Sequence, residues 1–389
     1  DVKGIGWKKC DAIALSKGMG KYSKERVGAF IKYYLTQEAE RGYTYVYANS
    51  QLMNAILDQI GQDISDEAIV NAIHGIQDSL WWSDDQECIG LKSYIELEKN
   101  IAKELIRIRN GENNFKYDGW EKIVAKREAE QGWSYTEQQK AAILATLKNN
   151  VVVISGLAGT GKSTVVAAIL DVLKEYSSVQ CALAGKAAAR MAEITGQEGY
   201  TIHRLLGYPS GDPQNYGFVF HKENPLNYNI IIVDEISMIN GRLFHNLISA
   251  IRTGAKLILL GDVGQLESIG CSNVAHDLIQ SSEIVSIELT EIHRQAAKSA
   301  IITDSISIRK GIQPIEKDWV GVETRGVLMD LTYECYSDAS NTFYRIMQQM
   351  SELLHQDIPI NDIQVIVPIK ERDAGTWNLN LAIQELYNP

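Results

Sequence analysis

The chain has 389 residues, of which 45% are hydrophobic and 22% are charged, with only 7 prolines. This composition fits a globular protein of roughly two or three domains, and it excludes collagen-like, low-complexity and small disulfide-stabilised chains. The formal net charge of -11 argues against a surface coated in nucleic acid, but it allows a local basic groove.

No apolar run approaches the roughly 18 residues of a membrane-spanning helix, so no membrane partner is expected. The five cysteines are scattered without a C-x-x-C pair, which indicates reduced thiols in the cytoplasm and no zinc site. The chain starts at Asp1 without a signal-like segment, and we interpret it as a fragment or a processed chain.

Residues 1–112 are predicted to form a helical amino-terminal domain. Apolar positions recur at helical spacing over residues 23–39, 49–60 and 95–109. A cluster of turn-forming residues at 110–114 marks the expected end of this domain.

Residues 113–292 show short β-branched runs that alternate with helical patterns. The runs lie at residues 151–154, 180–184, 230–233, 257–260 and 284–289. Their length is typical of strands buried on both faces of a parallel sheet, which predicts an α/β domain.

Residues 293–389 are predicted to be the start of a further domain. A helix is expected over residues 296–310, a strand over 363–367 and a last helix over 379–386. These residues are few for a complete α/β domain, so we expect the chain to stop before that domain ends.

The segment GLAGTGKS at residues 156–163 fits the phosphate-loop pattern G-x-x-x-x-G-K-S/T, between a predicted strand and a predicted helix. Its glycines let N–H groups approach phosphates, and the helix N-terminus adds positive potential. Lys162 is assigned to the β- and γ-phosphates and Ser163 to Mg²⁺, with a structural glycine-rich turn as the alternative. The expected nucleotide contacts are Gly156, Ala158, Gly159, Thr160, Gly161, Lys162, Ser163 and Thr164.

Four further candidates follow predicted strands. Asp234 and Glu235 stand at the carboxyl edge, where ligands bind in such sheets. We assign Asp234 to Mg²⁺ and Glu235 to activation of the attacking water. Gln265 is a candidate γ-phosphate sensor and Arg294 a candidate for stabilising phosphoryl charge. From spacing alone, a loop contact and a surface salt bridge are the alternatives for these two.

Seven segments occur in a fixed order: YTEQQ (135–139), GLAGTGKST (156–164), GKAA (185–188), TIHRLL (201–206), VDEISM (233–238), GDVGQL (261–266) and LTEIHRQ (289–295). Together they resemble superfamily 1 DNA helicases of the RecD/TraA type, in particular the stand-alone RecD-like branch. The resemblance implies ATP and Mg²⁺ as cofactors, with Gln139 reading the adenine and Gln265 and Arg294 contacting the γ-phosphate.

The same resemblance implies translocation in the 5′ to 3′ direction on DNA, in recombination or repair. The expected partner is single-stranded DNA or DNA with a 5′ single-stranded tail, bound by a monomer. The family's last motor motifs are missing after residues 365–368 and 375–389, which resemble the start of a second RecA-like domain. We therefore expect this chain to bind nucleotide but not to unwind DNA.

The chain departs from the family pattern at a few positions. Leu183-Ala184 replaces a Pro-Thr pair, which removes one expected contact with DNA phosphate, and Glu267-Ser268 replaces two prolines. His293 replaces the commoner tyrosine. None of these changes affects the ATP chemistry.

The Gly4-Ile5-Gly6 core resembles the helix-hairpin-helix of the same family. Two glycines permit a tight turn whose N–H groups face a phosphate, and lysines outnumber acids around it. A hairpin that only packs domains together is the alternative. The DNA-binding residues expected in the whole chain are Gly4, Gly6, Lys8, Lys186 and His203, with a structural role equally open for His203.

The combined prediction is an α/β P-loop NTPase with a RecA-like parallel sheet, a helical helix-hairpin-helix amino-terminal domain and a partial second RecA-like domain. One alternative is a DNA-tethering module that binds nucleotide as a structural ligand. Intact Lys162, Asp234 and Glu235 argue against it, because a silent site needs no base. A second alternative is an ATPase that remodels protein complexes, against which Gln139 and the hairpin argue.

Overall fold

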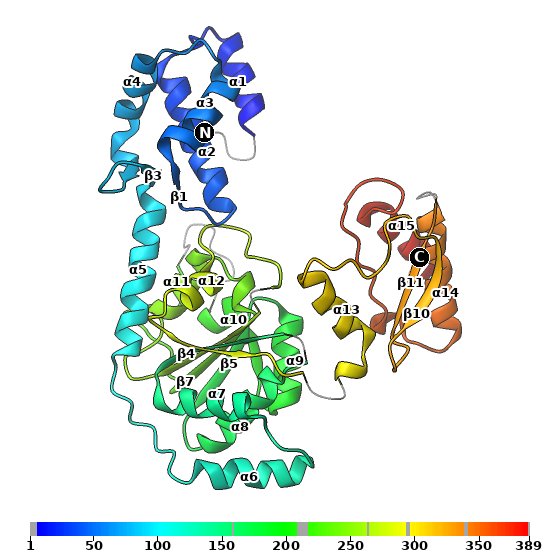
Figure 1. Cartoon of the computed structure of the whole chain (residues 1–389). Helices are drawn as coiled ribbons and strands as arrows, with labels where there is room; N and C mark the ends of the chain where they lie inside the picture. The colour runs from blue at the N-terminus through cyan, green and yellow to red at the C-terminus, as the bar shows by residue number, and fades with distance from the viewer. Residues whose placement is uncertain are drawn as a thin grey trace. The chain divides into compact units, whose positions relative to one another are not determined.

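The computed structural model describes residues 6–157, 159–207, 217–262, 264–292, 296–337 and 341–387. Contacts between residues divide the chain into two units, Asp1–His293 and Arg294–Pro389, and each is described by itself (Figure 1). Within the described ranges, every helix is too short or too polar to span a membrane.

The amino-terminal domain is mixed rather than purely helical. Its helices are α1 (Trp7–Ser16), α2 (Lys24–Glu40), α3 (Met53–Ile60) and α4 (Asp66–Ile76), and they accompany a small antiparallel sheet of order β1-β3-β2. The strands are β1 (Tyr45–Tyr47), β2 (Leu80–Trp82) and β3 (Cys88–Leu91). The domain is mostly helical as predicted, but its three strands were missed, because strands of three or four residues are too short to show a period of two.

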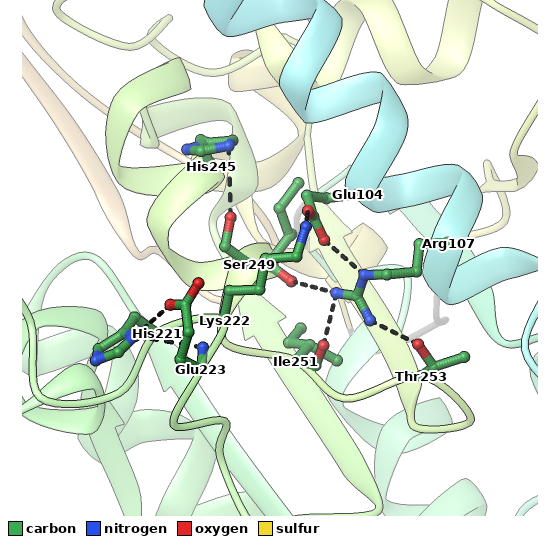
Figure 2. Close-up of polar contacts among 10 residues, drawn as sticks. Glu104, Arg107, His221, Lys222, Glu223, His245, Ser249, Ile251 and Thr253 are labelled. Atoms are coloured by element: carbon green, nitrogen blue, oxygen red, sulfur yellow. Dashed lines mark hydrogen bonds and ion pairs between the residues drawn. The ribbon is translucent and has the colours of Figure 1, made fainter.

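Helix α5 (Lys92–Arg109) leads from the small sheet to the larger one and is fixed on α11 (Gly241–Ser249) (Figure 2). The Arg107 guanidinium donates to three acceptors at the end of α11: the carbonyl oxygens of Ile248 (3.2 Å) and Ile251 (2.7 Å) and the hydroxyl of Thr253 (2.9 Å). The buried carboxylate of Glu104 accepts from Arg107 Nε at 2.6 Å and from Lys222 Nζ at 3.0 Å. Burial raises the pKa of Glu104, but these two cations outweigh it and hold the pKa below its ordinary value.

Six parallel strands form the large sheet, in the order β6-β5-β7-β8-β4-β9. They are β4 (Val151–Gly156), β5 (Ser178–Ala182), β6 (Gly199–Thr201), β7 (Ile230–Asp234), β8 (Lys256–Gly261) and β9 (Val285–Leu289). The five predicted strands are confirmed with small shifts in their ends. The sixth, β6, was missed because it has only three residues.

Alternate residues of the central strands enter two separate hydrophobic cores, one on each face of the sheet. Val151 and Val153 pack with residues of α5, α11 and α12 (Val274–Gln280), whereas Val152 and Ile154 pack with residues of α7 (Glu137–Lys148) and α8 (Lys162–Val172). The remaining helices of this unit are α6 (Trp120–Gln131), α9 (Gly185–Thr195) and α10 (Ile202–Leu206) (Figure 1). Burial on both faces explains why these strands are continuous apolar runs.

The unit Arg294–Pro389 contains the antiparallel pair β10 (Gly321–Arg325) and β11 (Leu331–Cys335), with α13 (Ala300–Arg309), α14 (Asn341–His355) and α15 (Thr376–Tyr387). The last predicted helix is confirmed as α15. The helix predicted over 296–310 is split, because the Ser299 side chain caps α13 by accepting from the N–H of Ile302.

The strand predicted over residues 363–367 was wrong. These residues form no strand, and Ile366 is 82% exposed. A strand needs a neighbour for its N–H and C=O groups, and β10 and β11 pair with each other instead. β-Branched composition alone therefore gave the wrong assignment.

Candidate nucleotide-binding site

Three of the segments predicted to be functional meet at the carboxyl edge of the large sheet. Strand β8 lies between β4 and β7, so the segments that follow these three strands are neighbours. The register pairs Ser155 with Gly261 and Val233 with Leu259. The fold therefore brings the phosphate loop, the Asp234-Glu235 pair and the turn at Gln265 to one place.

The phosphate loop has a backbone that requires glycine. A Cβ atom on Gly156 would lie 2.6 Å from the carbonyl oxygen of Leu289 and 2.8 Å from the hydroxyl of Thr160, so no larger residue fits. Gly159 and Gly161 have φ values of 79° and 84°, in the left-handed region that favours glycine. The loop thus turns sharply into the N-terminus of α8, a position that favours anions.

Lys162 lies over the phosphate loop. Its Nζ donates to the carbonyl oxygens of Gly156 at 2.5 Å and Leu157 at 3.2 Å. Lys162 also helps to hold down the pKa of Asp234, so the two charges act on each other across the strand ends. The ammonium is therefore close to both the loop and the acidic pair.

The acidic pair has a strained backbone and shifted pKa values. Glu235 has a φ of 56°, a left-handed conformation that raises the energy of a non-glycine residue by about 1–3 kcal/mol, and its N–H donates to Asp234 Oδ1 at 2.9 Å. Burial raises the pKa of both carboxyls, and Asp234 raises that of Glu235 further. Arg190 of α9 lowers both values, a role that sequence reasoning missed. A carboxylate with a raised pKa is a better general base near neutral pH.

Ser237 gives a further sign of a ligand site at this edge. The residue is 5% exposed, and within the described residues its hydroxyl makes no hydrogen bond. An unsatisfied buried hydroxyl is unfavourable by about 1–3 kcal/mol, so a bound ligand, ion or water at this edge would give it a partner.

Gln139 is 1% exposed and ties helix α7 to the phosphate loop. Its side-chain oxygen accepts from the N–H of Thr136 at 3.0 Å, and its Nε2 donates to the carbonyl oxygen of Thr160 at 2.9 Å. The backbone N–H of Gln139 completes a capping box with the Thr136 hydroxyl. In this structure Gln139 positions the loop, and its contact with adenine stays a prediction. The Thr-x-x-Gln spacing is the signal that could have revealed this role.

Two other residues of the YTEQQ segment make contacts near the loop that the sequence analysis did not assign. Gln138 accepts from the N–H of Thr290 at 2.9 Å and so joins α7 to the segment after β9. The hydroxyl of the buried Tyr135 donates to the carbonyl oxygen of Thr164 at 3.2 Å. Nothing in the local sequence pattern predicts these contacts.

The other predicted nucleotide residues fall around this edge or outside the described residues. Gln265 is exposed on a turn in which its N–H donates to the carbonyl oxygen of Asp262 at 3.0 Å. Ser163 is half-buried in the first turn of α8. Ala158 and Arg294 lie outside the described residues, so their predicted roles are not addressed by the geometry.

The predicted DNA contacts lie in two places. Lys186 lies in the first turn of α9 and His203 lies on α10; both are exposed, and both helices contact the edge strand β6. Gly6 caps α1 and Lys8 is exposed on it, whereas Gly4 lies outside the described residues.

The basic character of the amino-terminal domain is smaller than its sequence indicates. Arg26 is 5% exposed and forms two contacts with the Asp11 carboxylate, at 2.6 and 2.8 Å. Its charge is thus neutralised inside the domain, and the lysines carry the excess.

No group of three or more His, Cys, Asp or Glu side chains in the described ranges could hold a metal ion. Mg²⁺ often binds to one or two protein ligands together with substrate phosphates. Ser163 and Asp234 fit that kind of site, because both lie at the edge where the phosphate loop ends.

Comparisons with known proteins agree with this arrangement. A family model described as an AAA domain matches residues 134–325, and one described as the HHH domain of the ATP-dependent RecD2 DNA helicase matches residues 1–45. The ATP-dependent RecD2 DNA helicase of Deinococcus radiodurans is 33% identical over 275 residues, 70% of this chain and 34% of that protein. The RecBCD enzyme subunit RecD of Mycobacterium tuberculosis is 37% identical over 175 residues, 39% of this chain and 30% of that protein.

Among solved structures, the Pif1 helicase from Candida albicans aligns with a TM-score of 0.35 and 25% identity, over 46% of this chain and 45% of that chain. The chain spans about a third of the length of the two curated relatives.

Proposed function

Because the chain belongs to the RecD-like family of superfamily 1 DNA helicases, we propose that it couples ATP hydrolysis to movement along single-stranded DNA. The direction is 5′ to 3′, the partner is single-stranded DNA or DNA with a 5′ tail, and the setting is recombination or repair. The observation that carries this proposal is the meeting of Lys162 with the strained Asp234-Glu235 pair at one sheet edge.

In the proposed mechanism, the backbone of the phosphate loop and the N-terminus of α8 bind the triphosphate. Lys162 exchanges its loop carbonyls for phosphate oxygens, and Glu235 accepts a proton from the attacking water. Ser163 and Asp234 would hold Mg²⁺, which neutralises charge on the phosphates when it is bound. Gln265 and Arg294 are proposed to contact the γ-phosphate.

The DNA contacts are proposed for two surfaces, one formed by Lys186 and His203 and one by Gly4, Gly6 and Lys8. The exposure of Lys186, His203 and Lys8 supports this assignment. Phosphate contacts of this kind depend on salt, so binding should weaken as ionic strength rises.

The test is phosphate release by the full 389-residue chain with and without single-stranded DNA. We expect DNA to raise the rate several-fold, and Lys162→Ala to abolish both the basal and the stimulated rates. Hydrolysis without any response to DNA would favour an ATPase that remodels protein complexes. Nucleotide binding without hydrolysis would favour a DNA-tethering module.

Direction is tested by the displacement of streptavidin from single-stranded DNA that carries biotin at one end. A 5′ to 3′ motor displaces streptavidin from the 3′ end faster than from the 5′ end. The reverse preference would contradict the proposed direction.

A further inference from the structure

The segment that follows Gln265 has a second attachment, away from the nucleotide. Residues 264–273, here called the sensor segment, begin at the Asp262 turn on the motor sheet. Leu266 and Ile269 in its middle are 81% and 91% exposed. Its other end is hydrogen-bonded to residues of the amino-terminal domain and of α5. The segment is therefore attached at both ends, and its middle is exposed.

Two hydrogen bonds make this second attachment. The N–H of Gly270 donates to the carbonyl oxygen of Glu40 at the end of α2, at 3.3 Å. The hydroxyl of Ser272 donates to Glu98 Oε1 of α5, at 3.1 Å. One end of the sensor segment therefore depends on where the amino-terminal domain lies.

Glu98 joins both sides of this junction. Its other oxygen, Oε2, accepts from the hydroxyl of Thr44, directly before β1, at 3.2 Å. Thr44 is 7% exposed and Ser272 is 2% exposed, whereas Glu98 is half-buried, so both hydrogen bonds are partly shielded from water. Burial raises the pKa of Glu98, and the hydrogen bonds from Ser272 and Thr44 lower it in part.

Ser272 is held in a strained conformation. Its φ of 68° lies in the left-handed region, which is unfavourable for serine. The conformation is fixed from both sides, because the carbonyl oxygen of the preceding Cys271 accepts from the N–H of Gly241 at 2.9 Å while the Ser272 hydroxyl binds Glu98. A strained residue held by opposing contacts can switch when one of them weakens.

From this geometry we infer that Glu98 is a positioning residue that couples the sensor segment to the amino-terminal domain. A nucleotide-dependent shift of Gln265 moves Ser272, and the Ser272–Glu98–Thr44 connection carries this shift to β1. The effect is reciprocal, so DNA bound by the amino-terminal domain changes nucleotide affinity. The inference rests on the proposed function, because it takes the sensor segment to respond to nucleotide.

The first experiment measures hydrogen–deuterium exchange of the full chain with and without Mg²⁺ and a non-hydrolysable ATP analogue. We expect the analogue to change exchange at residues 40–47 as well as at residues 264–273. In Thr44→Val the change at residues 44–47 disappears while that at residues 264–273 remains, and residues 40–43 still respond through the hydrogen bond between Gly270 and Glu40. Thr44→Ser, which keeps the hydroxyl, restores it.

The second experiment measures the affinity of the analogue with and without single-stranded DNA. In the wild type we expect DNA to change the dissociation constant several-fold, and Glu98→Gln to bring that ratio close to one. Glu96→Gln is the matched control, since Glu96 is exposed on α5 two residues away.

The outcomes separate the two proposals. If the analogue binds but exchange at residues 44–47 is unchanged in the wild type, or changes equally in Thr44→Val, the coupling is refuted while the proposed function stands. If the wild type binds no analogue at all, the proposed function fails and the coupling fails with it.

Discussion

The two edges of the large sheet each carry a lysine ammonium group, but the two groups have different roles. At the carboxyl edge, the half-buried Lys162 donates to two carbonyls of the phosphate loop. At the amino edge, Lys256 at the start of β8 is 0% exposed and donates to the carbonyl oxygens of Thr146 (2.6 Å), Leu147 (3.4 Å) and Asn149 (2.5 Å). Its Nζ also lies 4.8 Å from the ring centroid of Phe115.

The difference between these lysines lies in what surrounds them. The acceptors of Lys256 are carbonyls at the end of α7, where a cation also interacts favourably with the helix dipole. Lys162 instead interacts with the acidic pair and lies on a loop whose glycines allow a tight turn. A lysine whose acceptors are enclosed stabilises the fold, and one whose acceptors lie at an open edge is available to a ligand.

The largest expected effect is the loss of ATP hydrolysis when Glu235, at the carboxyl edge, is changed. Glu235→Gln should lower the rate of ATP hydrolysis by about 10²–10⁴, because it removes the proposed general base. Nucleotide affinity should change little, since the phosphate loop is intact. Phosphate release and analogue binding measure the two effects, with the exposed Glu193→Gln as the control. A variant with normal hydrolysis would show that Glu235 is not the base.

The next effect separates the two lysines directly. Lys162→Met should lower hydrolysis by about 10²–10³ through lost charge stabilisation. Its unfolding free energy should stay within about 0.5 kcal/mol of the wild type, because the group is only half-buried. Denaturant unfolding combined with phosphate release checks both values. A large loss of stability would remove the contrast between the two edges.

Substitution of the lysine at the amino edge should instead lower the stability of the fold. Lys256→Met should lower the free energy of unfolding by about 2–4 kcal/mol, since it leaves three carbonyls without their donor. Urea unfolding measures the change, and Lys148→Met, an exposed lysine at the end of α7, is the matched control. Equal stability in the two variants would contradict the structural role of Lys256.

The smallest effect is a dependence on pH. Burial lowers the pKa of Lys256 from 10.5 to about 7, so between these values the unfolded chain binds more protons than the folded one. The contribution of this group to the unfolding free energy should therefore rise with pH across that window, by up to about 1.4 kcal/mol per pH unit. The difference in unfolding free energy between the wild type and Lys256→Met, measured from pH 7.5 to 9.5, gives the slope. A difference in unfolding free energy that does not change with pH would mean that the three carbonyls fully offset the lowering of the Lys256 pKa by burial.

The strands of the large sheet and the phosphate loop could be predicted because their causes are local. Continuous apolar runs specify buried strands, and the spacing of Gly156, Gly161 and Lys162 is set by the loop itself. The acidic pair also followed from its place after a buried run. The positions of these residues at one edge then follow from parallel topology.

The rest depends on contacts between residues that are distant in the sequence. The pairing of Arg26 with Asp11, the effect of Arg190 on the acidic pair and the junction at Glu98 have no local signature. The short strand β6 and the small amino-terminal sheet lacked enough residues to show a period. The error at residues 363–367 had the reverse cause, since strand-forming residues there have no strand to pair with.

Helix α5 acts as a rigid lever that is fixed at its carboxyl end. It has 18 residues, which gives a length of about 27 Å. Arg107 fixes the carboxyl end to the loop after α11, and Glu98 lies about 14 Å along the helix from it. A tilt of roughly 5° about the fixed end would move Glu98 by about 1 Å, enough to break a hydrogen bond. Very small rotations at the base of the helix would thus be amplified where Thr44 and Ser272 meet the Glu98 carboxylate.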